Sequence, residues 1–467
     1  MNLALLTPKT ELVWLAVQEM YNSFKLGEQV DPLQVSTMYE RILLLPSHHN
    51  HDKAKLLNLL GDICSKDQSS RDVDDLSNAI TMYQAAAREM PNNAIYSREL
   101  GICLLNRFQE LGDLNDLNDS IRVNEDAVRL TPDEYFDKPS HLNSLGNALM
   151  RRFEQQNDLA DLQRSIEIFG NAVELASDDG FDKLCAFDNL GSSLMRHFER
   201  VGDLASLNKA IQASDNAVRL TPDGFSGKLS QLNNLGVSLM RRFERVGDLI
   251  DLDRSIEVSE DAIQLISDKH LDKPRLLSNL GNSLRQRFRR LNDIGDLDKS
   301  IQVSENAVEL TPDGHPDKPY HLSNLGSSLK ERFEWSRDLA DLNRSIQTSE
   351  HAVQLTPNGY SDKPRHLSNL GDSLMCRFGH LDDPADLNRA IQVCEDAVQL
   401  TPDGDPDKPR CLSTLGASFM HRFRWLGDLA SLNRFVQSIK CVTSLTASAT
   451  LEIHFRLAPR HIAILKT

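Results

Sequence analysis

A glycine recurs every 45 residues through most of the chain, and this period constrains the fold more than any other feature of the sequence. Its eight occurrences are Gly101, Gly146, Gly191, Gly236, Gly281, Gly326, Gly371 and Gly416. A phenylalanine follows each glycine after seven residues, and an aspartate follows after twelve. Free loops tolerate insertions, yet this spacing never changes. We therefore expect stacked repeats in which even the connections pack against their neighbours.

Each repeat contains two helical patterns, as residues 139–176 illustrate. The first, helix A, begins near Pro139, and its apolar stripe consists of Leu142, Leu145, Leu149 and Phe153. The second, helix B, has Asp158 as its expected N-cap, and Asp161 suits the positive end of its dipole. In several repeats helix B stops at a Leu-Thr-Pro-Asp-Gly turn. The prediction is an all-α chain, an α-α superhelix of about nine helix-turn-helix units.

The recurrent glycine lies inside helix A, where it costs about 1 kcal/mol relative to alanine and needs a compensating reason. Nineteen residues after the glycine, helix B carries a small residue in seven repeats. These residues are Ser120, Ser165, Ala210, Ser255, Ser300, Ser345 and Ala390. Two small residues opposite each other would let helices A and B approach closely. We interpret the glycine as a packing device.

These features resemble the tetratricopeptide repeat, which has Leu-Gly in helix A, small residues in helix B and a closing proline. Here the matching residues are Leu145 and Gly146, then Ser120, Ala127 and Pro132 of the preceding repeat. The usual period is about 34 residues, so a period of 45 implies a longer helix A and an added Gly-Asp-Leu-x-Asp-Leu connection. In this form the chain resembles the long repeats of fungal proteins that often carry a caspase-like CHAT domain. It resembles the repeats of kinesin light chains more distantly.

The pattern divides the chain into three parts. Residues 1–52 are expected to form a degenerate helical pair that caps the stack, and residues 53–440 form the repeat array. Residues 441–467 are a capping helix or a truncated tail, and the CHAT domain itself is absent. Because Phe435 replaces a small residue near this apolar end, self-association through the array ends is a further hypothesis.

Composition excludes several functional classes. A formal net charge of −16 argues against nucleic acid or an anionic membrane as the main partner. The sequence has neither a run of 18 apolar residues nor a signal peptide, so we expect a cytoplasmic protein. The seven cysteines are scattered and form no Cys-x-x-Cys pair, which favours neither disulfides nor zinc.

Catalysis is not indicated either. The cysteines occupy repeat positions at which other repeats have Ala, Ser, Met or Arg, and no phosphate-binding glycine loop is present. His48, His49 and His51 could hold a metal, but they lie between predicted helices, and we interpret them as a solvated connector. We expect a non-enzymatic protein with no cofactor and no metal.

The resemblance implies that helix A lines a concave, peptide-binding face. The family's groove positions correspond here to Asn143, Asn147, Met150, Arg151, Ser192, Met195, Arg196, Asn233, Met240, Arg241, Asn282, Arg285 and Lys330. Short amides and hydroxyls can hydrogen-bond an extended backbone, and methionines adapt to varied side chains. Arg151, Arg196 and Arg241 would form a basic ladder for acidic or phosphorylated side chains. The alternative is that these arginines are simply a solvated surface.

Two functions therefore remain open. The first is a protein–protein interaction scaffold that binds a peptide segment of a partner on the helix A face. The second, which rests on the resemblance alone, is the sensor or regulatory arm of a CHAT protease system whose catalytic domain is missing from this chain. The repeated Asp-Lys-Pro motif before helix A is interpreted as a helix entry device, with a second binding surface on that rim as the alternative.

Overall fold

The computed structural model describes residues 8–28, 30–46, 50–65, 73–178, 180–222, 224–225, 227–402, 405 and 407–448. Within these ranges it contains twenty α-helices and no strand, which confirms the all-α prediction. The chain divides into two compact units, Met1–Ser238 and Leu239–Thr467, here called unit 1 and unit 2. The division falls inside one helix, α11, and each unit is described by itself.

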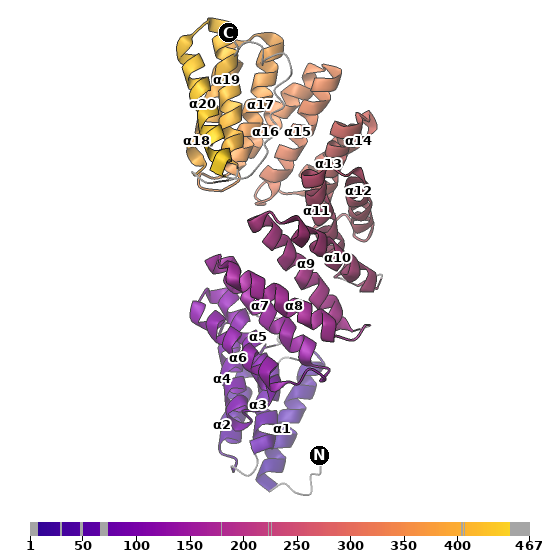
Figure 1. Cartoon of the computed structure of the whole chain (residues 1–467). Helices are drawn as coiled ribbons and strands as arrows, with labels where there is room; N and C mark the ends of the chain where they lie inside the picture. The colour runs from indigo at the N-terminus through magenta and orange to yellow at the C-terminus, as the bar shows by residue number, and fades with distance from the viewer. Residues whose placement is uncertain are drawn as a thin grey trace. The chain divides into compact units, whose positions relative to one another are not determined.

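The helices occur in consecutive pairs (Figure 1). The N-terminal helices are α1 (Pro8–Lys25) and α2 (Pro32–Leu43). The A helices are α3 (Asn50–Ser65), α5 (Ala94–Leu111), α7 (Lys138–Gln156), α9 (Phe181–Val201), α11 (Lys228–Val246), α13 (Lys273–Leu291), α15 (Lys318–Ser336), α17 (Lys363–Leu381) and α19 (Lys408–Leu426). The B helices are α4 (Val73–Glu89), α6 (Leu114–Leu130), α8 (Leu159–Leu175), α10 (Leu204–Leu220), α12 (Leu249–Gln264), α14 (Ile294–Leu310), α16 (Leu339–Leu355), α18 (Pro384–Leu400) and α20 (Leu429–Ser448).

Within each unit the A helices lie on the more tightly packed side of the stack. In unit 1, α5 contacts α7 and α7 contacts α9; in unit 2, α13, α15, α17 and α19 contact one another in order. No two successive B helices have comparable contacts among the described residues. In a stack of paired elements, the elements that touch their equivalents in the next repeat lie on the inner side. The A helices therefore share the inner face of each unit.

The ends of the helices follow from local chemistry. Asp158 Oδ1 accepts the backbone N–H of Ala160 at 2.9 Å, and Asp113 caps α6 in the same way, which confirms the predicted N-caps. Most B helices end at a threonine directly before the proline of the turn, as Thr131 does after α6. Helix A ends at a residue in the left-handed conformation, such as Gly202 with φ 74°.

The glycine of helix A lies where helix B approaches closely, so the packing interpretation is confirmed. A Cβ on Gly146 would lie 2.5 Å from a ring carbon of Phe169. The closest atoms thus belong to the residue 23 positions after the glycine, not 19 as predicted. The serine at 19 positions has a different role, since Ser300 Oγ donates to the carbonyl oxygen of Gly281 at 2.7 Å. Its small side chain fits because it bonds directly to the neighbouring backbone.

Candidate functional site: the helix A face and the rim

A bidentate ion pair joins helix A to helix B in most repeats. In unit 1, Arg152 donates from Nε and Nη2 to the two carboxylate oxygens of Asp161 at 2.7 and 2.6 Å. Its Nη1 reaches Asn118 on the preceding B helix at 3.2 Å. The equivalent pairs are Arg107–Asp116, Arg242–Asp251, Arg287–Asp296, Arg332–Asp341 and Arg377–Asp386. These arginines hold the repeats together and are not available for a ligand.

These ion pairs raise the pKa of their arginines. Hydrogen bonds to Asp296 and Asp341 raise the pKa of Arg287 and Arg332, respectively, above the ordinary range. The helical pattern assigns Asp161 only to the helix dipole and does not reveal its arginine. The available signal was an Arg-Phe dipeptide in each of these repeats, with an aspartate nine residues after the arginine.

In unit 1, α7 and α9 bring several predicted site residues onto one face. Asn147 and Ser192 are exposed, and Met150 and Met195 are partly exposed at the next positions along the two helices. Asn143, in contrast, is buried, and its amide donates to the carbonyl oxygen of Asp182 at 3.0 Å. Asn143 therefore joins two A helices and presents little surface to a ligand.

The three ladder arginines are half exposed, and each has an acidic partner on its own helix. Arg151 bonds Glu154 at 2.7 Å, and Arg196 bonds Glu199 at 3.1 Å; both pairs belong to unit 1. In unit 2, Arg241 bonds Glu244 at 2.9 Å. Such exposed pairs three residues apart contribute only about 0.3–0.5 kcal/mol. The glutamates weaken the positive potential of the arginines without fixing their side chains.

In unit 2 the predicted residues form an internal ion-pair network. Arg285 is only 12% exposed; its Nη1 bonds Glu331 of α15 at 2.9 Å, and its Nη2 bonds Asn282 at 2.7 Å. Arg289 Nε bonds the same Glu331 oxygen at 2.9 Å. Lys330 is paired with Glu334 at 2.7 Å. Arg285 and Lys330 are thus engaged within the protein.

The network stabilises the charge of Glu331, whereas burial lowers the pKa of Arg285. Burial alone would raise the pKa of Glu331, but Arg285 and Arg289 outweigh it, so the pKa lies below its usual range. Arg285 Nε and Glu331 Oε2 are buried and have no hydrogen-bond partner. Any ligand that reached this point would meet one additional donor and one additional acceptor.

The remaining predicted residues lie nearer the packed side of helix A. Met240 is buried, and Ser283 of the next A helix donates to its sulfur at 3.9 Å. Asn233 is partly buried in unit 1. Its neighbour Asn234 donates to Asp188 of α9 at 3.3 Å, and Asn369 donates in the same way to Ser323 of α15 at 2.7 Å. An asparagine two residues before the glycine thus bonds helix A to the preceding helix A, a role that the sequence analysis did not anticipate.

Three of the thiols, those of Cys64, Cys185 and Cys394, have the properties of structural rather than nucleophilic cysteines. Burial raises the pKa of Cys64 and of Cys394 to about 12, and that of Cys185 to about 11. A reactive thiolate requires a lowered pKa. In the part of the chain that the structure describes, no group of three or more His, Cys, Asp or Glu side chains could hold a metal ion, and His48 and His49 lie outside that part. No described helix is long and apolar enough to cross a membrane.

In five repeats an Asp-Lys-Pro motif joins a B helix to the following A helix. Lys138 donates to the carbonyl oxygens of Val128 and Thr131 at 2.8 and 2.6 Å, at the C-terminal end of α6. Lys318 and Lys408 make the same bonds in unit 2. The proline begins helix A, whereas Asp137 makes no capping bond with its side chain. The lysine thus stabilises the negative end of one helix dipole at the point where the next helix starts.

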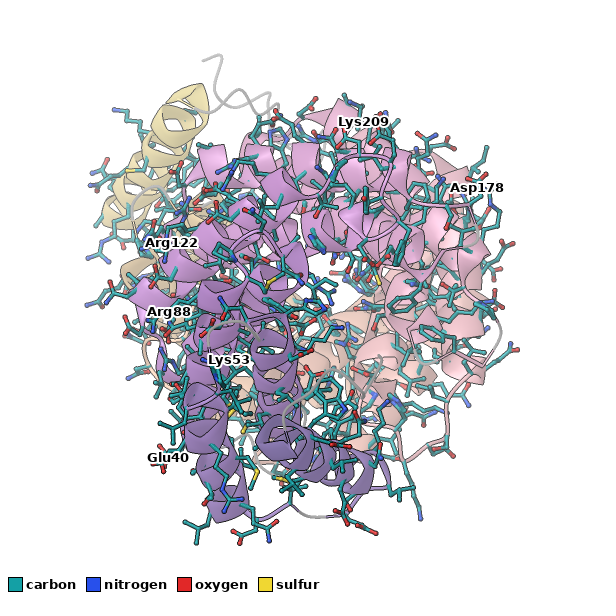
Figure 2. All side chains as sticks on the ribbon, turned by 90° about the horizontal axis from the view of Figure 1, so that it is seen from below. Glu40, Lys53, Arg88, Arg122, Asp178 and Lys209 are labelled. Atoms are coloured by element: carbon teal, nitrogen blue, oxygen red, sulfur yellow. The ribbon has the colours of Figure 1, made fainter. Side chains whose placement is uncertain are left out.

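A cavity of about 590 Å³ lies among these connections in unit 2. It is bounded by the first part of α13, by the α14–α15 and α16–α17 connections, and by the first turns of α15 and α17. The outer surfaces of the B helices, in contrast to this rim, carry exposed basic side chains. In unit 1, Figure 2 shows Arg122 of α6 and Lys209 of α10 on the outside of the packed helices.

Comparison with known proteins gives no match to a family model and none to a curated protein. Among solved structures, the C-terminal part of a TPR repeat-containing protein from Cytophaga hutchinsonii is 12% identical, with a TM-score of 0.42, and the match covers 69% of this chain and 99% of that one. A putative kinesin light chain with TPR-like repeats from Podospora anserina is 12% identical, with a TM-score of 0.37 and coverage of 47% and 98%. A monomeric mutant of IFIT1 with Gppp-AAAA is 12% identical, with a TM-score of 0.46 and coverage of 95% and 96%.

These identities and TM-scores describe similarity in the arrangement of the helices and give no information about ligands. The fold itself follows from the structure of this chain, in which A and B helices alternate at the period of 45 residues and close against each other at the glycine. The chain has the architecture of a tetratricopeptide-like repeat protein, as its sequence pattern predicted.

Proposed function

We propose that this protein is a non-enzymatic scaffold that binds a protein segment along the helix A face of its repeats. The observation that carries the proposal is the row of half-exposed side chains on α7 and α9. Asn147, Met150 and Arg151 recur 45 residues later as Ser192, Met195 and Arg196 on a helix that contacts the first. An extended segment meets equivalent chemistry at each repeat that it crosses.

The chemistry of this row favours a peptide over a small substrate. The amide and hydroxyl can bond a peptide backbone, and the flexible methionines accept varied apolar side chains. Arg151 and Arg196 supply positive charge, which favours acidic or phosphorylated side chains. A phosphate or carboxylate bound by two guanidinium N–H groups forms a stronger pair than the exposed intrahelical glutamates do.

The test compares two triple variants in affinity capture from cell lysate, with partners quantified by mass spectrometry. Arg151/Arg196/Arg241→Ala removes the ladder. Arg122/Arg129/Arg219→Ala removes three exposed arginines that also have polar partners three residues away, but on the B helices. Partners that bind the helix A face should fall about tenfold with the first variant and stay within about twofold with the second. Equal partner lists for the two variants would contradict the proposal.

The regulatory arm of a CHAT protease system stays a prediction from the sequence resemblance, and so does self-association through the array ends. No contact among the described residues favours either. A cytoplasmic location also stays a prediction.

A further inference from the structure

The cavity on the rim of unit 2 is large enough to hold several residues of a peptide. Its volume of about 590 Å³ falls within the range of about 300–1,000 Å³ that is typical of ligand pockets. It lies where B helices lead into A helices, and its lining residues belong to α13, α15, α16, α17 and their connections. The ladder arginines are not among these residues, so this site is independent of the function proposed above.

The walls of the cavity are rich in rings. Tyr320 and Tyr360 line it together with three histidines and three prolines. The guanidinium carbon of Arg365 lies 5.4 Å from the centre of the Tyr320 ring, and this cation–π contact holds the ring in place. Tyr360 is 61% exposed and offers its ring to whatever enters.

Most charged groups around the cavity are paired with an opposite charge, and the lining carboxylate of Asp317 lies 4.0 Å from His315 Nδ1. Arg275 is paired with Asp272 at 3.0 Å, Arg365 with Asp362 at 2.8 Å and Lys318 with Asp313 at 3.3 Å. The buried histidines add no charge at neutral pH, because burial lowers the pKa of His321 and of His366 to about 4. A polyphosphate or a strongly basic peptide would therefore gain little, and the cavity suits a ligand with little net charge.

The cavity offers several hydrogen-bond donors beside the carboxylates of Asp313, Asp317 and Asp362. Two tyrosine hydroxyls, two guanidinium groups and the amide of Asn279 line the cavity. The Nδ1 atoms of the lining residues His321 and His366 are buried without a hydrogen-bond partner. A polyproline II segment has the complementary character, because its carbonyl oxygens have no internal partners and each proline lacks an N–H. Its rings pack against aromatic side chains, as in other grooves that take proline-rich segments.

We propose that the rim cavity of unit 2 binds an extended, proline-containing segment of a partner protein. Tyr360 and Tyr320 pack against the proline rings, and the tyrosine hydroxyls and Arg275 donate to the segment's carbonyl oxygens. The equivalent positions in unit 1 differ. Tyr320 and Arg365 occupy the same position in successive repeats, six residues before the glycine. In unit 1 the residues at this position include Ser140, Cys185 and Ser230, so the stacked pair belongs to unit 2.

The chain contains a closely matched control for this site. Tyr135 occupies the same repeat position as Tyr360, eleven residues before the glycine, and is also 61% exposed. Both tyrosines lie in connections before helix A, so either can be replaced by alanine without disturbing a core. Circular dichroism of both variants checks that the helices are retained.

The experiment measures the binding of a fluorescent, uncharged proline-rich dodecapeptide to the full chain by anisotropy. We expect binding that changes little with salt, a loss of about tenfold with Tyr360→Ala and a change within about twofold with Tyr135→Ala. A peptide with its prolines replaced by alanine should bind at least about tenfold more weakly. The Arg151/Arg196/Arg241→Ala variant should bind normally, which separates this site from the helix A face.

Several outcomes would overturn the proposal. They are absence of binding at millimolar peptide, equal losses in the two tyrosine variants, and equal affinity for the alanine-substituted peptide. Stronger binding of a phosphopeptide or of a lysine-rich peptide, lost with Tyr360→Ala, would assign the cavity to a charged ligand instead.

Discussion

The helix A face of unit 1 differs from that of unit 2 in how it uses its arginines. Four positions after the glycine, two repeats of unit 1 have Met150 and Met195, whereas one repeat of unit 2 has Arg285; three other repeats of unit 2 have a methionine there, namely Met240, Met375 and Met420. Five positions after it, unit 1 has the half-exposed Arg151 and Arg196, whereas the repeat after Arg285 has Glu331. In unit 2 the arginine and the glutamate form an ion pair between two A helices, and the glutamate side chain is only 7% exposed.

This difference shows that side chains at one repeat position can lie in an internal ion pair or on the surface. A methionine followed by an arginine leaves the charge on the surface of unit 1, where only an exposed glutamate of the same helix bonds it. An arginine opposite a glutamate on the next A helix turns the same surface into an internal contact. Unit 1 is therefore the stronger candidate for an acidic ligand, and unit 2 for the rim site.

The largest expected effect comes from removing the carboxylate of unit 2. Glu331→Ala leaves Arg285 buried without its partner, and breaking such a pair costs about 3–5 kcal/mol. We expect about 3 kcal/mol here because Arg289 is half exposed and can be solvated. Urea unfolding followed by circular dichroism measures the change. Glu154→Ala, which removes the exposed partner of Arg151 in unit 1, should cost less than about 0.5 kcal/mol.

A double variant sharpens this comparison. Arg285→Met with Glu331→Arg reproduces the residues of unit 1 within unit 2. If the ion pair is only one of two ways to fill these positions, the double variant should recover most of the stability that Glu331→Ala loses. A double variant as unstable as the single one would show that unit 2 depends on the pair itself.

The next largest effect on stability comes from replacing the recurrent glycine of helix A, which can be compared between the two units. Gly146→Ala brings a Cβ against the Phe169 ring, and we expect a cost of about 2 kcal/mol. Gly281→Ala meets the small Ser304, whose hydroxyl can rotate, so its cost should be about 1 kcal/mol. Thermal unfolding of both variants tests the order. Gly170→Ala, in a helix with open space around it, should stabilise the protein by up to about 1 kcal/mol.

Acid should affect unit 2 through its buried histidines. The folded-state pKa of His366 is about 4, below an ordinary value near 6.5, so the neutral form is favoured by folding. This contribution to stability is present above pH 6.5 and is lost as the pH falls from 6.5 toward 4. We expect a loss of about 1 kcal/mol at pH 5.5 from this residue alone.

Unfolding midpoints at pH 7.5 and 5.5 measure this loss, with His366→Gln as the test variant. Another repeat has a buried glutamine, Gln231, at the position equivalent to His366, so glutamine fits this site. The variant should lose less stability between the two pH values than the parent does. A pH dependence equal to that of the parent would exclude His366 as its source.

The smallest effect is a gain in binding. Glu154→Gln with Glu199→Gln removes the intrahelical partners of Arg151 and Arg196 and frees both guanidiniums. Binding of an acidic peptide to the helix A face should strengthen about threefold to fivefold, since each of the two exposed pairs is worth about 0.3–0.5 kcal/mol. Isothermal titration calorimetry with the captured partner's segment measures it. Unchanged affinity, with the arginines shown to matter by their alanine variants, would mean that the glutamates do not compete with the ligand.

The helices and their ends could be predicted because their causes are local. Asp158 caps the helix that begins at the next residue, and the proline of Leu-Thr-Pro-Asp-Gly ends a B helix, whatever lies nearby. Asn147, Arg151, Ser192 and Arg196 are exposed on helix A at positions that the resemblance to the tetratricopeptide repeat implied. The burial of Asn143 and Met240 was not implied by it, because each is covered by a residue about 40 positions later.

The sequence by itself determined that this protein is a stack of helix pairs, because a fixed period of 45 residues with capped, amphipathic helices has few other solutions. The tertiary structure alone decided which polar side chains are available. Arg285 and Glu331 lie 46 residues apart, and Arg152 and Asn118 lie 34 apart, so their contacts exist only after the repeats have stacked. Local spacing sets the direction in which a side chain points, whereas its partner is set by the neighbouring repeat.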